Sequence, residues 1–346
     1  MPVDSRATLS TVAHRAGVSR QTVSNAMNSP EMLRPETLAR VQQAIAELGY
    51  RPSRAAKALR TGAARAIGLA LPPKAETGAG GVGDRFLHAV ATAARNRGYR
   101  ILLLAASSDD DELDQYEEVL AAREIESVLL TGTHHGDPRT AWLSREGVSF
   151  VTFGRPWGAQ EEGTTHAWVD VDGAAGTDVA VTHLAALGHT RIGFVGWPAG
   201  SGVGDDRRAG WLRAVHRLRL APAEQPSAWV ARTDNDVRDA RSAAATLIAE
   251  RSATAVVCVS DTVALGALRA ASEHPHTVAV AGFDDTPVAA AVGLTSLAQP
   301  LEVAAESAVA LLLDERPAGT TPPPTHILLD PDLQVRESTG SRVATA

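Results

Sequence analysis

The first fifty residues carry apolar side chains at intervals of three and four, which is the spacing of amphipathic helices. The first predicted helix begins after Thr8, whose hydroxyl can cap it, and ends at Gly17. Its apolar face consists of Leu9, Val12, Ala13 and Ala16. A short Gly-Val-Ser turn follows, and Ser19 is the predicted cap of a second helix.

The second and third predicted helices complete a small bundle. In the second helix, Val23 and either Ala26 or Met27 point toward the core. The third begins at Pro35 and ends at Gly49, residues that are typical of helix starts and ends respectively. Its single apolar stripe is predicted to contain Leu38, Val41, Ile45 and Leu48.

The outward face of the second helix is suited to nucleic acid. Arg20, Gln21, Thr22 and Asn25 carry donors and acceptors that can reach base edges and phosphates. Two short helices joined by a tight turn, with such a face on the second, predict a helix-turn-helix DNA reader. The alternative is a three-helix bundle with an ordinary polar surface, which requires none of these side chains.

Charge is divided unevenly along the chain. Residues 1–65 hold ten basic and four acidic side chains, a formal charge of +6. The rest of the chain holds −13, which gives the total of −7. A basic head on an acidic body is expected where the head alone contacts phosphate.

A short basic segment follows the bundle. Ser53 can cap a helix of about two turns that ends at Arg60, in which Leu59 is the one large apolar side chain. Such a helix is too short to be stable alone in water. Two interpretations stay open: a linker helix that packs Leu59 on the body, or a segment that folds on DNA and inserts Leu59 into the minor groove.

From residue 66 the pattern changes to short apolar runs that alternate with helical stretches. Such alternation predicts parallel sheets covered by helices, here in two halves. The first half consists of Ile67–Leu71, Phe86–Arg97, Ile101–Leu104, Leu113–Ala122, Ser127–Leu130, Thr140–Glu146 and Ser149–Phe153. The second consists of Ala174–Leu187, Ile192–Val195, Arg208–Leu218, Trp229–Ala231, Val237–Glu250, Ala255–Val259, Val263–Ala271 and Val278–Gly282. Leu297–Pro300 and Ile327–Leu329 are expected to cross back between the halves, and such two-lobed proteins bind ligands at the carboxyl ends of their strands.

Two motifs in the head are those of a known family. Residues 8–28 read Thr-hydrophobic-x-x-Val-Ala-x-x-Ala-Gly-Val-Ser-x-x-Thr-Val-Ser-x-x-hydrophobic-Asn, and residues 50–59 read Tyr-x-Pro-x-x-x-Ala-x-x-Leu. In these motifs, and over almost its full length, the chain resembles bacterial transcriptional regulators of the lactose-repressor (LacI) family. The resemblance implies an N-terminal all-α helix-turn-helix domain followed by an α/β two-lobed effector domain that is periplasmic-binding-protein-like.

The expected domain boundaries follow from the pattern and the resemblance together. Residues 1–50 form the DNA-binding domain, 51–65 the hinge helix and linker, and 66–346 the effector-binding and dimerisation domain. Within the last, the N-lobe is expected at about 66–166 and 298–323, and the C-lobe at about 167–297 and 324–339.

The resemblance also implies roles for residues of the head. Arg20, Gln21 and Asn25 match positions that read the major groove, and Leu59 matches the intercalating hinge leucine. Phosphates are expected at Thr8, Ser10, Thr22 and Ser24. The full set of expected DNA contacts is Thr8, Ser10, Ser19, Arg20, Gln21, Thr22, Ser24, Asn25, Ser53, Ala58, Leu59 and Arg60. The chain departs from the family pattern at Ser53, in place of a common asparagine, and at Arg34, in place of the usual Ser/Thr cap.

An effector site between the lobes is implied in the same way. Arg207 matches the family arginine that hydrogen-bonds the effector, and Asp284 matches the acidic residue that faces it. A planar guanidinium opposite a carboxylate suits the paired hydroxyls of a sugar. The expected site residues are Arg155, Arg207, Asn235, Ser260, Asp284 and Gln299. The alternative is a structural ion pair between the lobes, and Gly154 stands where relatives often have an acid.

Other patterns carry less weight. Cys258 lies in an apolar run typical of a buried strand, which favours packing over a reactive thiol. Residues 78–83 match the dinucleotide pattern G-x-G-x-x-G, but they do not directly follow a strand, so a loop at the cleft rim is expected. The chain shows neither the apolar run of a signal peptide nor a membrane span, so a cytoplasmic protein is expected.

Histidine pairs occur twice. His134–His135 with Asp137, and His274 with His276, have metal-like spacing but no third ligand nearby in the sequence. Both pairs are expected in solvated loops, and neither a metal nor a cofactor is expected.

The sequence therefore predicts a DNA-binding transcriptional regulator rather than an enzyme. The favoured form is a repressor of carbohydrate-utilisation genes that is controlled by a small-molecule effector, namely a sugar. A homodimer on palindromic double-stranded operator DNA is expected because one reader covers only a half-site. Residues 336–342 offer no heptad for a tetramer. Two alternatives stay open: a nicotinamide-dependent dehydrogenase built on residues 78–83, and a sugar-binding protein whose head is vestigial.

Overall fold

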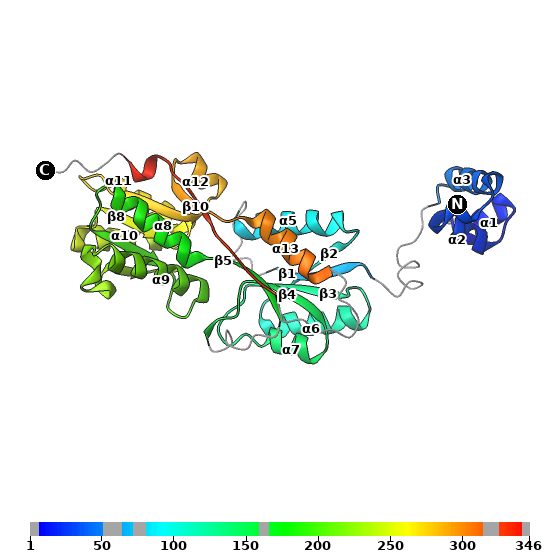
Figure 1. Ribbon diagram of the computed structural model, residues 1–346, viewed down its shortest axis with the longest axis horizontal. Coiled ribbons are helices and arrows are strands. Elements are labelled where there is room, and N and C mark those ends of the chain that lie inside the picture. Colours follow the sequence, from blue (N-terminus) through cyan, green and yellow to red (C-terminus); the bar gives the residue numbers. More distant parts are fainter. Residues whose placement is uncertain (1–6, 51–63, 72–80, 159–165, 314–324, 341–346) are drawn as a thin grey trace, which may run out of the picture. The chain divides into compact units, whose positions relative to one another are not determined.

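The computed structural model describes residues 7–50, 64–71, 81–158, 166–313 and 325–340 (Figure 1). The chain divides into two compact units, Met1–Ala64 and Arg65–Ala346. The predicted hinge, with Ser53, Ala58, Leu59 and Arg60, lies outside the described residues. So do Gly78 and Gly80 of the glycine-rich run.

The head is the predicted three-helix bundle. Its helices are α1 (Leu9–Ala16), α2 (Arg20–Asn28) and α3 (Pro35–Leu48), with a 3₁₀ turn at Pro30–Met32. Thr8 and Thr11 form a reciprocal capping box, and Gly17 ends α1 in the left-handed conformation. The Ser19 hydroxyl accepts a hydrogen bond from the Thr22 N–H, as a cap should.

The core of the head differs slightly from the predicted stripe. It contains Val12, Ala13, Ala16, Val23, Val41 and Ala44. On α3 the prediction for Leu48 is wrong, because this side chain is 37% exposed. The small Ala44 is buried instead, since the short helices of the head approach α3 closely near its middle. Arg34 makes no side-chain cap to α3, as its substitution for a hydroxyl residue led us to expect.

The first lobe of the second unit is built on a parallel sheet of order β11-β5-β4-β3-β1-β2. Its strands are β1 (Ala66–Leu71), β2 (Arg100–Ala105), β3 (Ser127–Thr131), β4 (Ser149–Phe153), β5 (Ala167–Val171) and β11 (His326–Leu329). Helices α5 (Val82–Asn96) and α13 (Leu301–Leu313) lie side by side and share one core with the sheet. Helices α6 (Asp109–Ala121) and α7 (Arg139–Arg145) pack against the other face.

The second lobe has a sheet of order β12-β10-β9-β8-β6-β7, in which β12 alone is antiparallel to its neighbour. Its strands are β6 (Ile192–Gly196), β7 (Val230–Arg232), β8 (Ala255–Cys258), β9 (Ala279–Asp284), β10 (Thr295–Ala298) and β12 (Asp332–Gln334). Its helices are α8 (Gly173–Ala186), α9 (Gly202–Arg217), α10 (Val237–Arg251), α11 (Asp261–Ser272) and α12 (Pro287–Ala291). Helix α9 begins six residues before the predicted start, because Ser201 caps it despite the following glycines. Cys258 is buried in β8, where it packs as predicted.

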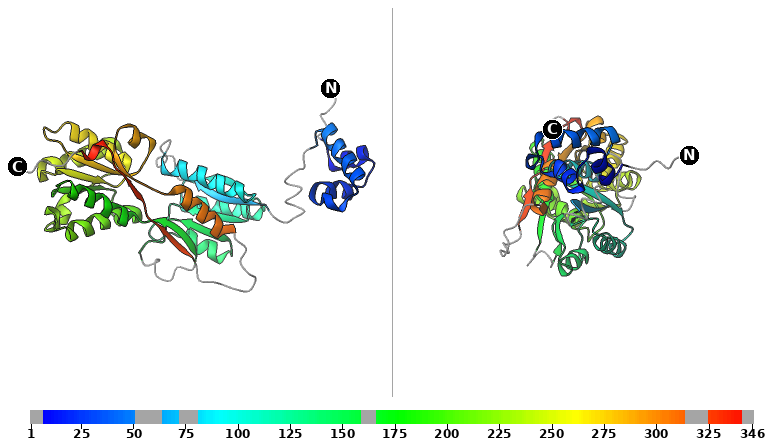
Figure 2. Two further views of the ribbon diagram at one scale, coloured as in Figure 1. Left: turned by 45° about the horizontal axis from the view of Figure 1, so that its top comes forward. Right: turned by 90° about the vertical axis from the view of Figure 1, so that its right-hand side faces the viewer.

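The chain passes between the lobes three times: after β5, after β10 and after β11 (Figure 2). The predicted lobe boundaries at residues 166 and 323 are therefore wrong. Strands β5 and β11 were expected in the second lobe, but they pair with each other and complete the first sheet. The Asp172 N–H donates to the Leu329 carbonyl at 2.8 Å, so two of the crossing segments stay hydrogen-bonded as they leave the sheet.

Close packing of α8 against α9 depends on a glycine. A Cβ added at Gly210 would lie 2.0 Å from the Ala174 carbonyl oxygen, which belongs to the rigid backbone of α8. We expect Gly210→Ala to lower the free energy of unfolding by about 1–3 kcal/mol or more, because the two helices must separate. Gly83→Ala on α5 is the matched control, since a Cβ there meets nothing within 4 Å. Equal stability of the two variants in urea denaturation would contradict this account.

Candidate functional site

The outward face of α2 carries the expected DNA-reading side chains. Arg20 and Gln21 are exposed in its first turn, which contains no acidic residue. The Gln21 amide donates to Asn25 Oδ1 at 2.9 Å, so the two amide side chains are held together. A helix N-terminus with a positive side chain and no carboxylate is suited to a phosphate backbone.

The hydroxyl residues of the head serve its own fold as well. Thr8 and Ser19 are exposed caps, and Thr22 Oγ1 lies 2.9 Å from Ser19 Oγ. Ser10 is exposed on α1, and Ser24 is half-buried on α2. The described members of the predicted set therefore lie on the first turns of α1 and α2 or on the outer side of α2.

A cavity of about 780 Å³ lies between the two lobes of the second unit. Both sheets reverse their strand order there, the first between β1 and β3 and the second between β6 and β8. Ligands of open α/β sheets bind at this position, beyond the carboxyl ends of the strands. Of the six predicted effector residues, Arg207, Asn235, Asp284 and Gln299 line the cavity.

Arg207 lies on α9 and is 5% exposed. Its Nη1 donates to the Val259 carbonyl at 2.5 Å and lies 3.5 Å from Asp284 Oδ1. The guanidinium stacks on the Phe283 ring, 3.6 Å from its centroid. Its Nε–H is buried and has no hydrogen-bond partner among the described residues.

Asp284 ends β9 with a φ of 117°, a conformation that costs a non-glycine residue energy. Gln299, in the crossing segment after β10, donates to its Oδ1 at 2.7 Å. Burial raises the pKa of Asp284 to about 7, although Arg207 opposes the shift. The cavity therefore contains a carboxyl group that titrates near neutral pH.

The other predicted residues have structural partners. Ser260 is buried, caps α11 and donates to Asn235 Oδ1 at 2.7 Å, and it does not line the cavity. Arg155 does not line the cavity either. Its Nη2 lies 2.7 Å from Asp206 Oδ2 on the other lobe, and its Nε lies 3.3 Å from Asp170 Oδ2. These contacts lack hydrogen-bond geometry and are ionic, so Arg155 joins the lobes beside the cavity.

Gly154 explains the departure from the family pattern. Its φ is 112°, and an added Cβ would lie 2.5 Å from Thr133 Oγ1. An acidic side chain at this position would require the backbone and Thr133 to move. The cavity wall of this chain is therefore built without that carboxylate.

The first lobe contributes four polar residues that the sequence did not predict as part of an effector site; of these, only His134 belongs to a pattern noted above. Asp109, Glu112, His134 and Arg139 all line the cavity. Asp109 Oδ2 lies 2.9 Å from His134 Nε2, across a separation of 25 residues in the sequence. The run of acids after Ser108 was the available signal, but the strand order was needed to bring it beside His134.

The same loops contain one group with metal-ligand spacing. Ligand atoms of Asp109, His134 and Asp137 lie within 4.8 Å of one another. Arg139 contacts the carboxylates of both aspartates: its Nη2 lies 2.7 Å from Asp137 Oδ2, and its Nε lies 3.5 Å from Asp109 Oδ1. Both oxygens of Asp137 already accept hydrogen bonds from Arg139, so this carboxylate is directed to the guanidinium and does not suit a further cation.

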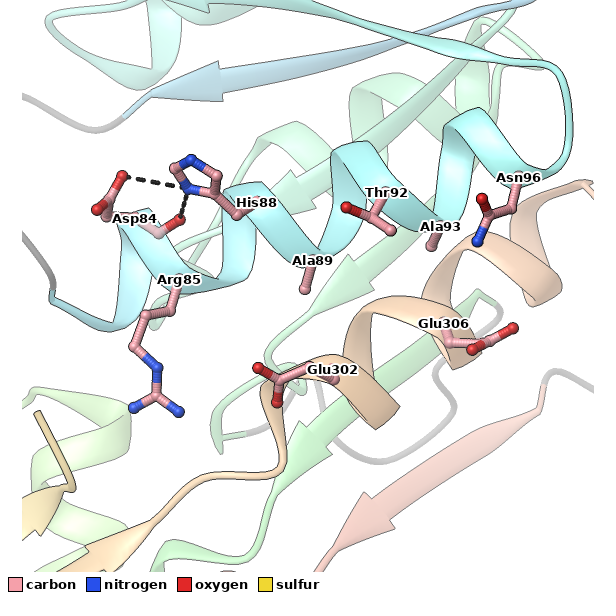
Figure 3. Close-up of a pocket in the computed structure, with 9 residues that line it drawn as sticks. All are labelled: Asp84, Arg85, His88, Ala89, Thr92, Ala93, Asn96, Glu302 and Glu306. Atoms are coloured by element: carbon pink, nitrogen blue, oxygen red, sulfur yellow. Dashed lines mark hydrogen bonds and ion pairs between the residues drawn. The ribbon is translucent and has the colours of Figure 1, made fainter.

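A second hollow, of about 470 Å³, lies between α5 and α13 (Figure 3). Glu302 and Glu306 of α13 border it opposite Ala89 and Thr92 of α5. Arg85 lines one end of it and donates to the carbonyls of Asp284 and Asp285 at 3.1 and 3.0 Å. Arg85 thus contacts the other lobe, and the hollow itself is an open polar surface of the first lobe.

Comparison with known proteins decides the family. The family model for bacterial regulatory proteins of the lacI family matches residues 8–53, and a periplasmic-binding-protein-like domain matches residues 181–339. The transcriptional regulator CelR of Thermobifida fusca is 33% identical over 96% of this chain and 98% of its own length. The chain belongs to the lacI family of bacterial regulatory proteins. It is a helix-turn-helix transcriptional regulator, as the motifs predicted.

Solved structures of lacI-family proteins show the same architecture. A CelR–cellobiose complex is 30% identical, with a TM-score of 0.70, and covers 96% of this chain and all of its own. The lac repressor dimer bound to operator and an anti-inducer has a TM-score of 0.82 at 24% identity over 97% of this chain and 99% of its own. The family consists of DNA-binding regulators, which does not favour the dehydrogenase alternative. No helix in the described part of the chain is long and apolar enough to cross a membrane.

The buried carboxyl group gives a prediction on pH. A raised pKa means that the neutral form of Asp284 suits the fold, so its contribution to stability is lost as pH rises through about 7. We expect unliganded wild type to lose thermal stability relative to Asp284→Asn between pH 6 and pH 8. Thermal unfolding at both values measures this, with the exposed Asp234→Asn as control. Parallel pH profiles of wild type and Asp284→Asn would contradict the prediction.

Proposed function

We propose that this lacI-family regulator is a dimeric repressor of carbohydrate-utilisation genes that binds a palindromic operator and is controlled by a sugar. The observation that carries the proposal is the arrangement at the cavity. Arg207 and Asp284 lie side by side in its wall, with Arg207 Nη1 3.5 Å from Asp284 Oδ1. A planar donor next to an acceptor fits vicinal hydroxyls, and the relative CelR has been solved with cellobiose.

The charge and surface of the head support operator binding. The exposed Arg20 and Gln21 stand where a recognition helix presents its first turn to the major groove. The basic charge of residues 1–65 suits phosphate contacts on either side. One such head covers a half-site, which is the reason for proposing two copies on a symmetric operator.

Control by the sugar would act through the hinge. We propose that the two-turn helix predicted from Ser53 to Arg60 folds only on operator, because a helix of that length is unstable alone in water. A change in the lobe angle on sugar binding would alter the distance between the two hinges of a dimer. The reader helices need not change.

We expect different residues of α2 to determine the sequence preference and the overall affinity of operator binding. Arg20→Ala is expected to cost about 1–3 kcal/mol of operator binding and to relax preference at one base pair. Thr22→Ala should weaken binding to all sequences alike, because a phosphate contact carries no base information. Arg40→Ala on α3 removes an exposed positive charge outside the reader face and is the control. Selection of bound duplexes from a random library measures the preference, and an unchanged motif for Arg20→Ala would refute the assignment.

Effector response should depend on Arg207. We expect Arg207→Ala to bind sugar at least about tenfold more weakly, because a hydrogen bond from a charged group contributes about 1.5–3 kcal/mol. Operator affinity without sugar should stay close to that of wild type. Arg208→Ala is the matched control, since this neighbour does not line the cavity. Operator titration by fluorescence anisotropy with and without sugar tests the pair.

Leu59→Ala is the complementary variant. It should weaken operator binding and leave sugar affinity unchanged, because the role proposed for Leu59 is insertion into the minor groove and not contact with the sugar. An Arg207→Ala protein that responds to sugar as wild type does would mean that the effector binds elsewhere.

A further inference from the structure

The wall of the cavity formed by the first lobe has its own polar cluster. Asp109 begins α6 directly after its cap Ser108, and Glu112 lies one turn further. His134 and Arg139 follow β3. Strands β2 and β3 flank β1 in the sheet, so the loops that leave their carboxyl ends are neighbours. Arg207 and Asp284 belong to the opposite lobe, so the cavity has polar groups on both walls.

Arg139 holds this cluster rigid. The side chain is 5% exposed, and its Nη1 donates to Glu112 Oε2 at 2.8 Å. Its Nε and Nη2 donate to the two oxygens of Asp137 at 2.9 and 2.7 Å, and Nη2 also donates to the Gly132 carbonyl. All of the nitrogens of Arg139 are therefore used within the protein. A ligand has to be recognised by the residues that Arg139 positions.

Asp109 and His134 remain open to the cavity. Their side chains are 31% and 44% exposed, unlike those of Glu112, Asp137 and Arg139. Asp109 Oδ2 contacts His134, whereas Oδ1 lies 3.5 Å from the nearest nitrogen of Arg139, beyond a good hydrogen bond. This oxygen keeps accepting capacity toward the cavity. A hydroxyl group of a ligand can donate a hydrogen bond to it.

We propose that Asp109 and His134 form a second sugar subsite, which binds a ring joined to the one held by Arg207 and Asp284. The inference rests on the proposed sugar effector and specifies its class as sugars of two or more linked rings. A cavity of about 780 Å³ lies well within the range of about 300–1,000 Å³ that encloses ligands larger than one ring.

Other side chains of the cavity wall fit the same ligand class. Trp197 of the second lobe lines the cavity and is half-buried, and indole faces pack against the apolar faces of sugar rings. Trp157 of the first lobe also lines the cavity, but its ring is packed between Gly202 and Arg155, so it shapes the wall.

The test compares one-ring and two-ring sugars on the full-length protein. Glucose and galactose, and the disaccharides cellobiose, maltose and lactose, are titrated by isothermal calorimetry into wild type, Asp109→Asn and His134→Ala. Wild type should bind one disaccharide at least about tenfold more tightly than its component monosaccharide. Asp109→Asn should remove most of that preference and leave the monosaccharide affinity unchanged, because only the second ring loses a hydrogen bond to a charged group.

Asp110→Asn is the matched control, since this neighbouring acid is exposed and does not line the cavity. It should keep the preference of wild type, and circular dichroism of each variant checks that the fold is intact. Two results would overturn the second subsite. One is a higher affinity of wild type for monosaccharides than for disaccharides, and the other is a preference for disaccharides that persists in both Asp109→Asn and His134→Ala. If wild type binds none of the sugars, the proposed sugar effector itself fails, and the inference fails with it.

Discussion

A single buried cation organises the carboxyl edge of the second sheet. Taking a guanidinium out of water costs several kcal/mol unless its donors and charge are satisfied. Arg207 meets most of this requirement with the Val259 carbonyl, the Asp284 carboxyl group and the face of Phe283, while its Nε–H has no partner among the described residues. The backbone next to the Arg207 side chain has to be free of side chains that would overlap with it. An added Cβ at Gly173 would lie 2.9 Å from Arg207 Cγ, so the first turn of α8 cannot carry a side chain there.

The same cation accounts for the strain beside it. Asp284 holds a positive φ that non-glycine residues avoid, and this conformation ends β9 with the carboxyl group next to the guanidinium. Gln299 fixes one carboxyl oxygen from a segment that leads into the other lobe. Ligand recognition and the connection between the lobes therefore share one set of hydrogen bonds. A molecule that binds beside Arg207 and Asp284 therefore acts next to the segment that joins the lobes.

Local features of the fold could be predicted from the sequence. The caps Thr8 and Ser19, and the terminal Gly17 and Gly49, act through neighbours within four residues, so a short stretch of sequence contains all the information. The lobe boundaries could not be predicted in this way. Strand β5 lies between β4 and β11 in the first sheet, and its pairing with β11 joins residues 158 positions apart, such as Trp168 and His326, which no local pattern encodes.

The residues of the candidate site also differ in how far the sequence could predict them. Arg207, Asn235, Asp284 and Gln299 came from the family pattern, and each lines the cavity. Arg155 and Ser260 came from the same pattern but are occupied by an ion pair and a helix cap. The cluster at Asp109 was missed because its members are joined only by the strand order of the first sheet. The hydrogen bonds of a side chain decide whether it is available to a ligand, and they depend on residues far away in the chain.

The interleaved lobes have a consequence for how the protein is made. Helix α13 covers the core of the first lobe and β11 is its edge strand, while β10 and β12 belong to the second lobe, and all of these lie after residue 294. A ribosome must pass residue 329 before the first sheet has all of its strands, and residue 334 before the second sheet does. The described contacts of the head lie within residues 7–50, so this domain can fold as soon as it emerges. During synthesis a finished DNA reader therefore precedes an unfinished sensor on the nascent chain.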